Sequence, residues 1–488
     1  MTSFLSLKLL ILLPIIASIM IFMPILKNNF IYIRRFTILF SIIYFFYSVS
    51  FYIFYNVNNN DCVLCTSIPI IKNWGINFSL GVDSLSIIMI LLTTFIFLLV
   101  SLSAKLYIKN NHKYFYALIL LLESILIGIF STTDMFLFFG LWELELIPMY
   151  ILISLYGNHK AKEAALKFVI YTFAGSLFIL LAILLIYHNN FVLTGILTGN
   201  FTEIQINNLN LISQILISVL LLLGFGVKIP IIPLHRWLID THSNSCTPVS
   251  VILAAILLKL GVYGVLRFNL GFLPLGFSVL APILACLALI NIIYGAALAY
   301  NQNNIKKIIA YSSISQMGII ILGISSMTYV GYIGAIYHVV SHAFVAAGLF
   351  IVAGIIKQKF NTNELNVLNG IQKVTPKLFG FFIVSAFAGI GTPFLSGFVG
   401  EFLSIYGSIL SPIPFLKIFA LLATIILILS ALYILKIIHK GFYGILPCKY
   451  LKVQDVAVHE FIILTTISIM IFILGCFPNL LIEFFTGV

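Results

Sequence analysis

Charge is scarce in this sequence. Charged residues make up 8% of the 488 positions, whereas hydrophobic residues make up 62%. This composition excludes a water-soluble globular protein, because no soluble fold buries so much apolar surface. Apolar runs of about 20 residues, long enough to cross a bilayer as a helix, occur about fourteen times. Their approximate centres are residues 16, 43, 92, 122, 145, 177, 221, 257, 288, 315, 343, 390, 424 and 472. We therefore expect an all-α polytopic membrane protein.

Long polar segments are also absent. The longest ones lie near residues 56–75, 189–210 and 358–377, and none of them is long enough for a soluble domain. The first apolar run lacks a small-residue cleavage site, so it predicts a retained helix and not a signal peptide.

The six cysteines give no sign of a metal or redox centre. Cys62 and Cys65 form a C-x-x-C motif in a predicted outer loop, without a second pair or a nearby histidine to complete a zinc site. They are either incidental residues or a local disulfide. Phosphate loops, dinucleotide fingerprints, nucleophile–base sets and iron–sulfur spacings are missing as well. We expect no cofactor and no metal in this chain, and no redox chemistry.

Positive charge exceeds negative charge by 12, which raises the question of nucleic acid as a partner. The basic residues argue against nucleic acid, because they fall in alternate loops as the positive-inside rule requires. Lys72 and Lys417 are the exceptions. The basic loops contain Lys27, Arg34, Arg35, Lys105, Lys109, Lys113, Lys160, Lys162, Lys167, Arg236, Lys306, Lys307, Lys357, Lys359, Lys373, Lys377, Lys436, Lys440, Lys449 and Lys452. These loops are expected in the cytoplasm or matrix, with both termini on the outer, periplasmic or intermembrane side.

A few ionisable residues stand inside the apolar runs. Lys228 lies in the run 220–232 with Pro230 close behind it, and Lys259 lies in the next run. A charge at membrane depth is costly, so such residues mark ion or proton pathways. The carboxylates in predicted spans are Glu123, Glu143, Glu145 and Glu401.

Two predicted helices are interrupted by glycine and proline in the same way. GFGVKIPIIP surrounds Lys228, and GIGTPFLSGFVGE ends at Glu401. These are helices seven and twelve, so each interruption falls at the fourth position of a five-helix repeat, and the odd number implies inverted copies. Paired broken helices indicate a transport site, although ordinary proline kinks are the alternative. The predicted parts are helices 1–3 in 1–110, a first repeat of helices 4–8 in 111–270, a second inverted repeat of helices 9–13 in 271–440, and helix 14 in 441–488.

Seven segments resemble the antiporter-like, proton-pumping subunits of respiratory complex I, most closely the chain-4 or M-type members. The segments are GVDSLS at 81–86, LWELELIPMYILISLYG at 141–157, VKIPIIPLHRWLIDTH at 227–242, TPVSVILAAILLKLGVYG at 247–264, NNIKKIIAYSSISQMG at 303–318, SHAFVAAGLF at 341–350 and GTPFLSGFVGEFL at 391–403. The resemblance implies fourteen helices in two inverted repeats, and proton pumping by a chain that itself binds neither NADH nor quinone.

The resemblance also implies site residues and partners. Glu143 and Lys228 match the glutamate and lysine of helices five and seven. Lys259 matches the central lysine of helix eight, and Glu401 matches the glutamate of helix twelve. NADH, FMN, iron–sulfur clusters and quinone are expected in partner subunits. The expected partners are the other membrane subunits of complex I, especially neighbouring antiporter-like subunits, and the lipid bilayer.

The chain departs from the family pattern in places that leave these four charges intact. Gln316 stands where the family commonly has a histidine, which questions a histidine relay at that position. Asn303 and Asn304 stand where an acidic residue is usual before helix ten, and THSNSCTP follows Asp240 where many members have an alanine–histidine pair and an acidic residue.

The residue types suit proton transfer. Glu143 and Lys228 could form a pair that exchanges a proton as it opens and closes, with a static salt bridge as the alternative. Lys259 is a candidate proton acceptor, and a snorkelling lysine is the alternative. Glu401 is either the helix-twelve glutamate of the second half-channel, as the resemblance implies, or a helix cap or a buried acid whose hydrogen bonds are satisfied by packing.

Further residues are secondary candidates for the same relay. His338 and His342 are one helical turn apart and would share a face. With His235 they could link Lys259 toward Glu401, since histidine titrates near neutrality; structural hydrogen bonding is the alternative, and a metal lacks a third ligand. Glu145 projects from a different helix face than Glu143, toward a neighbouring subunit or a side branch, and Glu123 is a secondary carboxylate. Asp134, Arg236, Asp240 and Lys306 are expected as solvated residues near helix ends.

The predicted function is therefore proton translocation driven by electron transfer from NADH to quinone elsewhere in the complex. The alternatives are a subunit of a multi-subunit sodium–proton antiporter, a subunit of a membrane-bound hydrogenase or photosynthetic-type complex, and a structural scaffold whose charges do not move. The TPVS and SQMG segments favour a bacterial plasma membrane, with the mitochondrial inner membrane as the alternative.

Overall fold

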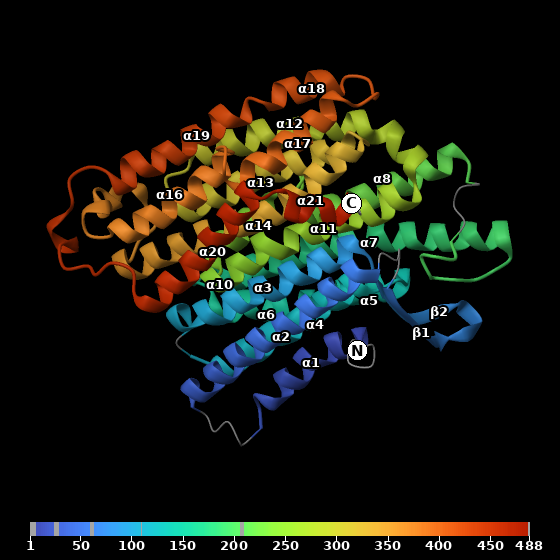
Figure 1. The fold of residues 1–488 in the computed structure, drawn as a ribbon, viewed down its shortest axis with the longest axis horizontal. Helices are drawn as coiled ribbons and strands as arrows, with labels where there is room; N and C mark the ends of the chain where they lie inside the picture. Colours follow the sequence, from blue (N-terminus) through green and yellow to red (C-terminus); the bar gives the residue numbers. More distant parts are fainter. Residues whose placement is uncertain (1–5, 24–28, 59–62, 109, 205–208, 487–488) are drawn as a thin grey trace. The chain divides into compact units, whose positions relative to one another are not determined.

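The computed structural model describes residues 6–23, 29–58, 63–108, 110–204 and 209–486 (Figure 1). The internal contacts divide the chain into two compact units. The first contains Met1–Phe225 and Phe268–Gly276, and the second contains Gly226–Arg267 and Phe277–Thr486.

Helices dominate the amino-terminal half of the chain, with one pair of strands. The elements are α1 (Leu7–Met20), α2 (Phe30–Asn58), β1 (Val63–Ile71), β2 (Ile76–Val82), α3 (Ser84–Tyr107), α4 (His112–Ser131), α5 (Met135–Leu144), α6 (Leu146–Tyr156), α7 (Ala161–Thr194) and α8 (Leu211–Lys228). In the first unit α1 packs on α4, α2 packs on α3, and α6 packs on α7.

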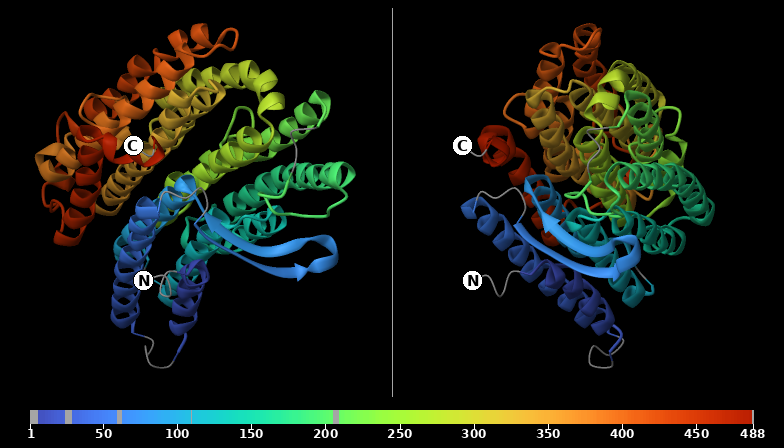
Figure 2. Two further views of the ribbon diagram at one scale, coloured as in Figure 1. Left: turned by 45° about the vertical axis from the view of Figure 1, so that its right-hand side comes forward. Right: turned by 90° about the vertical axis from the view of Figure 1, so that its right-hand side faces the viewer.

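The strands form an antiparallel hairpin, which the sequence analysis did not predict (Figure 2). The run VLCTSIPII is rich in β-branched residues, which suit a strand. Gly75 ends the connecting turn at φ +59°, and a side chain there would collide with the carbonyl of Leu197. Cys65 is disulfide-bonded, which favours the disulfide interpretation over an incidental residue, whereas Cys62 lies outside the described residues. The free cysteines of the described chain are Cys246, Cys286, Cys448 and Cys476.

The carboxyl-terminal half is helical throughout its regular elements. They are α9 (Arg236–Asn244), α10 (Thr247–Ile252), α11 (Leu258–Gly264), α12 (Pro274–Asn301), α13 (Ile305–Ser325), α14 (Tyr329–Phe360), α15 (Leu365–Leu368), α16 (Pro376–Ile390), α17 (Ser396–Ile409), α18 (Leu416–Ala423), α19 (Ile426–Ile437), α20 (Val458–Cys476) and α21 (Asn479–Thr486). Within the second unit α14 packs against α13, α16, α17 and α20, so it forms the centre of that unit (Figure 1).

The predicted spans correspond to observed helices. In the described part of the chain, 12 helices are long and apolar enough to cross a membrane, and Leu7–Met20 and Pro376–Ile390 are shorter apolar helices. Each expected centre falls within one of these segments. The prediction of a polytopic helical fold is confirmed, whereas the count of fourteen crossings and the inverted repeats remain predictions, as do the boundaries of the predicted parts.

Both predicted helix interruptions are present. Helix α8 ends at Lys228 and α9 begins at Arg236, while α16 ends at Ile390 and α17 begins at Ser396. At the first break, the Asn291 side chain accepts a hydrogen bond from Ile232 N at 2.9 Å and donates one to the Pro230 carbonyl at 3.3 Å. The Asn291 side chain therefore provides hydrogen bonds for backbone groups that the helix break leaves without partners, as a membrane interior requires.

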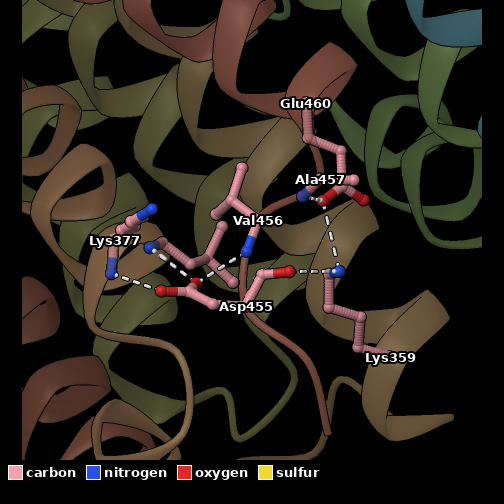
Figure 3. Close-up of polar contacts among 7 residues, drawn as sticks. Lys359, Lys377, Asp455, Val456, Ala457 and Glu460 are labelled. Carbon is pink, nitrogen blue, oxygen red and sulfur yellow. Dashed lines mark hydrogen bonds and ion pairs between the residues drawn. The ribbon is translucent and has the colours of Figure 1, made fainter.

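A polar clamp joins three segments at one end of the second unit (Figure 3). The Asp455 carboxylate accepts hydrogen bonds from Lys377 N at 2.8 Å and Leu378 N at 3.3 Å, at the start of α16. Lys359, at the end of α14, pairs with Glu460 at 3.2 Å and donates to the Asp455 carbonyl at 3.1 Å. The clamp thus connects α14 and α16 to the segment that leads into α20.

Candidate functional site

Lys259 is fully buried in the centre of the second unit. It lies on α11, which is flanked by π-helical turns at Leu253–Leu257 and Val265–Leu270. Its ammonium donates to the carbonyl of Ala254 and contacts His342 Nδ1 at 2.8 Å. The alternative of a snorkelling lysine is wrong, because this side chain ends inside protein and not at a surface. π-helical turns often mark functional sites, and the sequence analysis did not find these.

His338 and His342 share one face of α14, as their spacing predicted. Their ring centroids are 6.3 Å apart with an interplanar angle of 27°. His338 Nε2 lies 2.8 Å from Gln316 Oε1, and Gln316 Nε2 donates to the Gly389 carbonyl at 2.9 Å. The structure therefore brings Lys259, His342, His338 and Gln316 into one line of polar side chains through an apolar interior.

Glu401 is buried on α17, with 3% of its surface exposed. Its carboxylate lies against Gly391, where a side chain would come within 2.2 Å of Oε2. Both carboxylate oxygens lack a partner at ordinary hydrogen-bond geometry among the described residues, and the Gln316 side chain is the group that interacts with the carboxylate. The position next to the broken helix is as predicted, whereas the choice between a proton-carrying and a packing role stays a prediction.

Glu143 lies on α5 in the first unit, and Lys228 lies at the end of α8 in the second unit, where it is buried. Their pairing remains a prediction. Glu145 is fully buried at the junction of α5 and α6, so it does not lie on a surface that a neighbouring subunit could contact. Glu123 is buried on α4, and both of its carboxylate oxygens lack a hydrogen-bond partner in the described part of the chain.

His235 immediately precedes α9 and contacts the ring of Tyr294 edge-on, at 6.0 Å between centroids. Its part in a relay stays a prediction. Among the described residues no group of three or more histidine, cysteine or acidic side chains could hold a metal ion.

The expectation for Lys306 was wrong. This lysine is only 3% exposed, and its Nζ donates to the Ser245 carbonyl at 2.7 Å and to Ser250 Oγ at 3.0 Å. His242 is a further residue that the sequence analysis missed: it is fully buried and stacks on Phe350 at 4.7 Å. The sequence feature that could have drawn attention to His242 is its position in THSNSCTP, a segment that differs from the usual family pattern. Asp134 caps α5 through Phe136 N and Leu137 N, as expected for a helix end, but the expectation that it is solvated was wrong, because it is fully buried.

Comparisons with known proteins identify the family of the chain and its fold. The family described as "NADH:quinone oxidoreductase/Mrp antiporter, TM" matches residues 131–427. The chain belongs to this family. It is therefore a multi-pass membrane protein, and its apolar helices agree with that.

Two relatives match most of the chain. The chain is 38% identical over 432 residues to "NAD(P)H-quinone oxidoreductase chain 4 1" of Picosynechococcus sp., covering 87% of this chain and 80% of the relative. It is 37% identical to "NAD(P)H-quinone oxidoreductase chain 4" of Prochlorococcus marinus, covering 92% of this chain and 86% of the relative.

Two solved structures share the fold. A chain of respiratory complex I from Thermus thermophilus with bound NADH matches with a TM-score of 0.87 at 26% identity, covering 98% of this chain and 97% of that chain. A chain of the Mrp complex from Dietzia sp. matches with a TM-score of 0.86 at 22% identity, covering 99% of this chain and 51% of that chain. The predicted resemblance to antiporter-like subunits of complex I is confirmed.

Proposed function

We propose that this chain is the proton-translocating chain-4 subunit of an NADH–quinone oxidoreductase, without a redox centre of its own. The observation that carries the proposal is the 2.8 Å contact between Lys259 Nζ and His342 Nδ1 in a buried environment. Burying an ammonium group is costly, and a lysine–histidine contact leaves its charge uncompensated, so packing alone does not explain the pair. Lysine and histidine side chains can both bind and release protons, so the contact is suited to proton transfer.

The elementary step is transfer of a proton from Lys259 Nζ to the lone pair of His342 Nδ1. Lysine becomes a neutral amine and histidine becomes an imidazolium, so the number of protons and the total charge are unchanged. Transfer on to His338 needs a bridging water, because the ring centroids are 6.3 Å apart. Glu401 then accepts the proton on the side of the second broken helix.

The other predicted residues take supporting roles in this proposal. The Glu143–Lys228 pair opens and closes as redox energy from elsewhere in the complex is released, and this changes the proton supply to Lys259. Glu123, Glu145 and His235 are secondary sites that bind protons on their way to Lys259. The partners are the membrane subunits of the complex, and NADH, FMN, iron–sulfur clusters and quinone belong to other subunits. The proposed location is a bacterial plasma membrane with both termini on the periplasmic side.

The test is NADH oxidation measured together with proton pumping in membrane vesicles that carry wild type, Lys259→Ala or Lys105→Ala. Lys105 is exposed at the end of α3 and serves as the matched control. Native gels measure assembly, so that pumping is expressed per assembled complex. Lys259→Ala should lose at least about tenfold in pumping, as expected for removal of a proton-transfer group, while Lys105→Ala should keep it. Wild-type pumping by assembled Lys259→Ala complexes would refute the proposal.

A second candidate function is cation–proton antiport without redox coupling. The description of the matching family, which includes Mrp antiporters, favours this candidate. Sodium-dependent proton exchange in the absence of NADH, together with NADH oxidation that does not depend on this chain, would indicate the antiporter.

A further inference from the structure

We infer that Gln316 is a positioning residue that keeps a proton on His338 Nε2 and leaves Nδ1 as the atom through which His338 exchanges protons. The inference rests on the proposed relay and deepens it. It concerns four groups within the second unit: the Gly389 carbonyl, the Gln316 amide, the His338 ring and Gly400 on α17.

The carbonyl of Gly389 is available because of the sequence that breaks the helix. In a continuous helix this carbonyl would accept from the backbone N–H four residues later. That position is Pro393, which has no N–H, and Gly391 leaves the helix at φ +82°. The Gly389 carbonyl instead accepts from Gln316 Nε2 at 2.9 Å.

This contact determines which way the Gln316 amide points. A carbonyl oxygen only accepts, so the group that faces Gly389 must be the NH2 end of the amide. The oxygen end then faces His338 Nε2 at 2.8 Å, and because it also only accepts, Nε2 must carry a proton. The free carbonyl of the broken helix therefore specifies, through one amide, the protonation pattern of a histidine on α14.

The remaining ring nitrogen of His338 is left for proton exchange. An amide oxygen does not take up a proton under these conditions, so Nε2 has no onward route. Nδ1 is buried without a hydrogen-bond partner among the described residues. It faces Gly400, where a Cβ would lie 2.8 Å from Nδ1, and Gly400 precedes Glu401 on the same helix. A proton that arrives binds the Nδ1 lone pair to give the imidazolium, and the same N–H bond breaks when the proton leaves.

This role explains how glutamine can stand at position 316. It carries no proton itself, but it has both a donor and an acceptor, which a purely apolar residue lacks. Without it the Nε2 proton would be buried and unsatisfied, and His338 would lose the hydrogen bond that orients its ring and places its proton on Nε2.

The test is a double-mutant cycle with Gln316→Leu, His338→Gln and the combination, in the assembled complex. Protons pumped per NADH oxidised are measured in vesicles, with assembly checked by native gel. Gln214→Leu is the control, because Gln214 is also a buried glutamine that bonds backbone, donating to the Leu209 carbonyl and accepting from Gly276 N, within the first unit.

We expect Gln316→Leu to lower pumping by about fivefold, the effect of one buried hydrogen bond. His338→Gln should lower it by at least about tenfold, because it removes a proton-transfer group. The double variant should pump no less than His338→Gln alone, because the inference has Gln316 affect pumping through His338 and not through its contacts with Glu401 and Tyr433. Gln214→Leu should keep its pumping per assembled complex.

Three results would overturn the inference. Losses that multiply in the double variant would mean that Gln316 acts independently of His338. Unchanged pumping in Gln316→Leu would remove its role, and unchanged pumping in His338→Gln would remove His338 from the path. Failure of the relay itself is detected separately, by Lys259→Ala complexes that still pump.

Discussion

Lys259 Nζ and His342 Nδ1 lie 2.8 Å apart although the two residues are 83 positions apart in the sequence. They come from α11 and α14, and both side chains are buried. The ammonium also donates to the carbonyl of Ala254 in the preceding π-helical turn, so its orientation is determined from two sides. This contact joins the central lysine to the histidines of α14.

His342→Gln should lower proton pumping by at least about tenfold, because glutamine can accept from Lys259 but cannot carry the proton onward. The measurement is pumping per assembled complex with NADH as electron donor. His439→Gln is the matched control, since His439 is an exposed histidine after α19. Equal pumping by the two variants would contradict a role for His342.

Lys259→Arg should preserve the buried positive charge but abolish proton transfer, because a guanidinium does not release its proton in proteins. We expect assembled complexes with pumping close to the background of uncoupled vesicles. A scaffold role predicts the opposite, namely that arginine replaces lysine without loss. Native gels and pumping assays on the same membranes distinguish the two.

Gly391→Ala should displace the Glu401 side chain and lower pumping. Gly391 has φ +82°, and an added Cβ would lie 2.2 Å from Glu401 Oε2. The strained backbone alone costs about 1 kcal/mol or more. Gly380→Ala, in the helix α16 that precedes Gly391, is the control, because a Cβ there meets nothing within 4 Å. If both variants pump like wild type, the position of the Glu401 side chain next to the break does not affect pumping.

Asp455→Ala should lower thermal stability while leaving pumping per assembled complex unchanged. The carboxylate accepts hydrogen bonds from two backbone N–H groups at the start of α16 (Figure 3). Loss of such an interaction at a helix end costs about 1 kcal/mol of folding free energy. The loss is measured as a lower midpoint of thermal denaturation of the purified complex. Asp455→Asn keeps an acceptor oxygen and should retain part of the stability; pumping losses in either variant would count against a purely structural clamp.

Several features were predictable from the sequence because they are encoded locally. Apolar runs of membrane length, the proline and glycine interruptions near Lys228 and Glu401, and the charges inside apolar helices all depend on neighbouring residues only. The i, i+4 spacing of His338 and His342 also sufficed to place both rings on one face.

Only the tertiary structure decided what these residues contact. Helix α14 is buried almost all the way round, so its sequence does not reveal that the face with both histidines meets Lys259 and Gln316. Gln316 looked like the loss of a histidine, yet packing against the free carbonyl of Gly389 turned it into the partner of His338. Lys306 looked like a solvated helix end and proved to be enclosed by Ser245 and Ser250. The physical reason is the same in each case: hydropathy specifies that a helix is buried, whereas its rotation and its neighbours depend on side-chain packing between segments far apart in the chain.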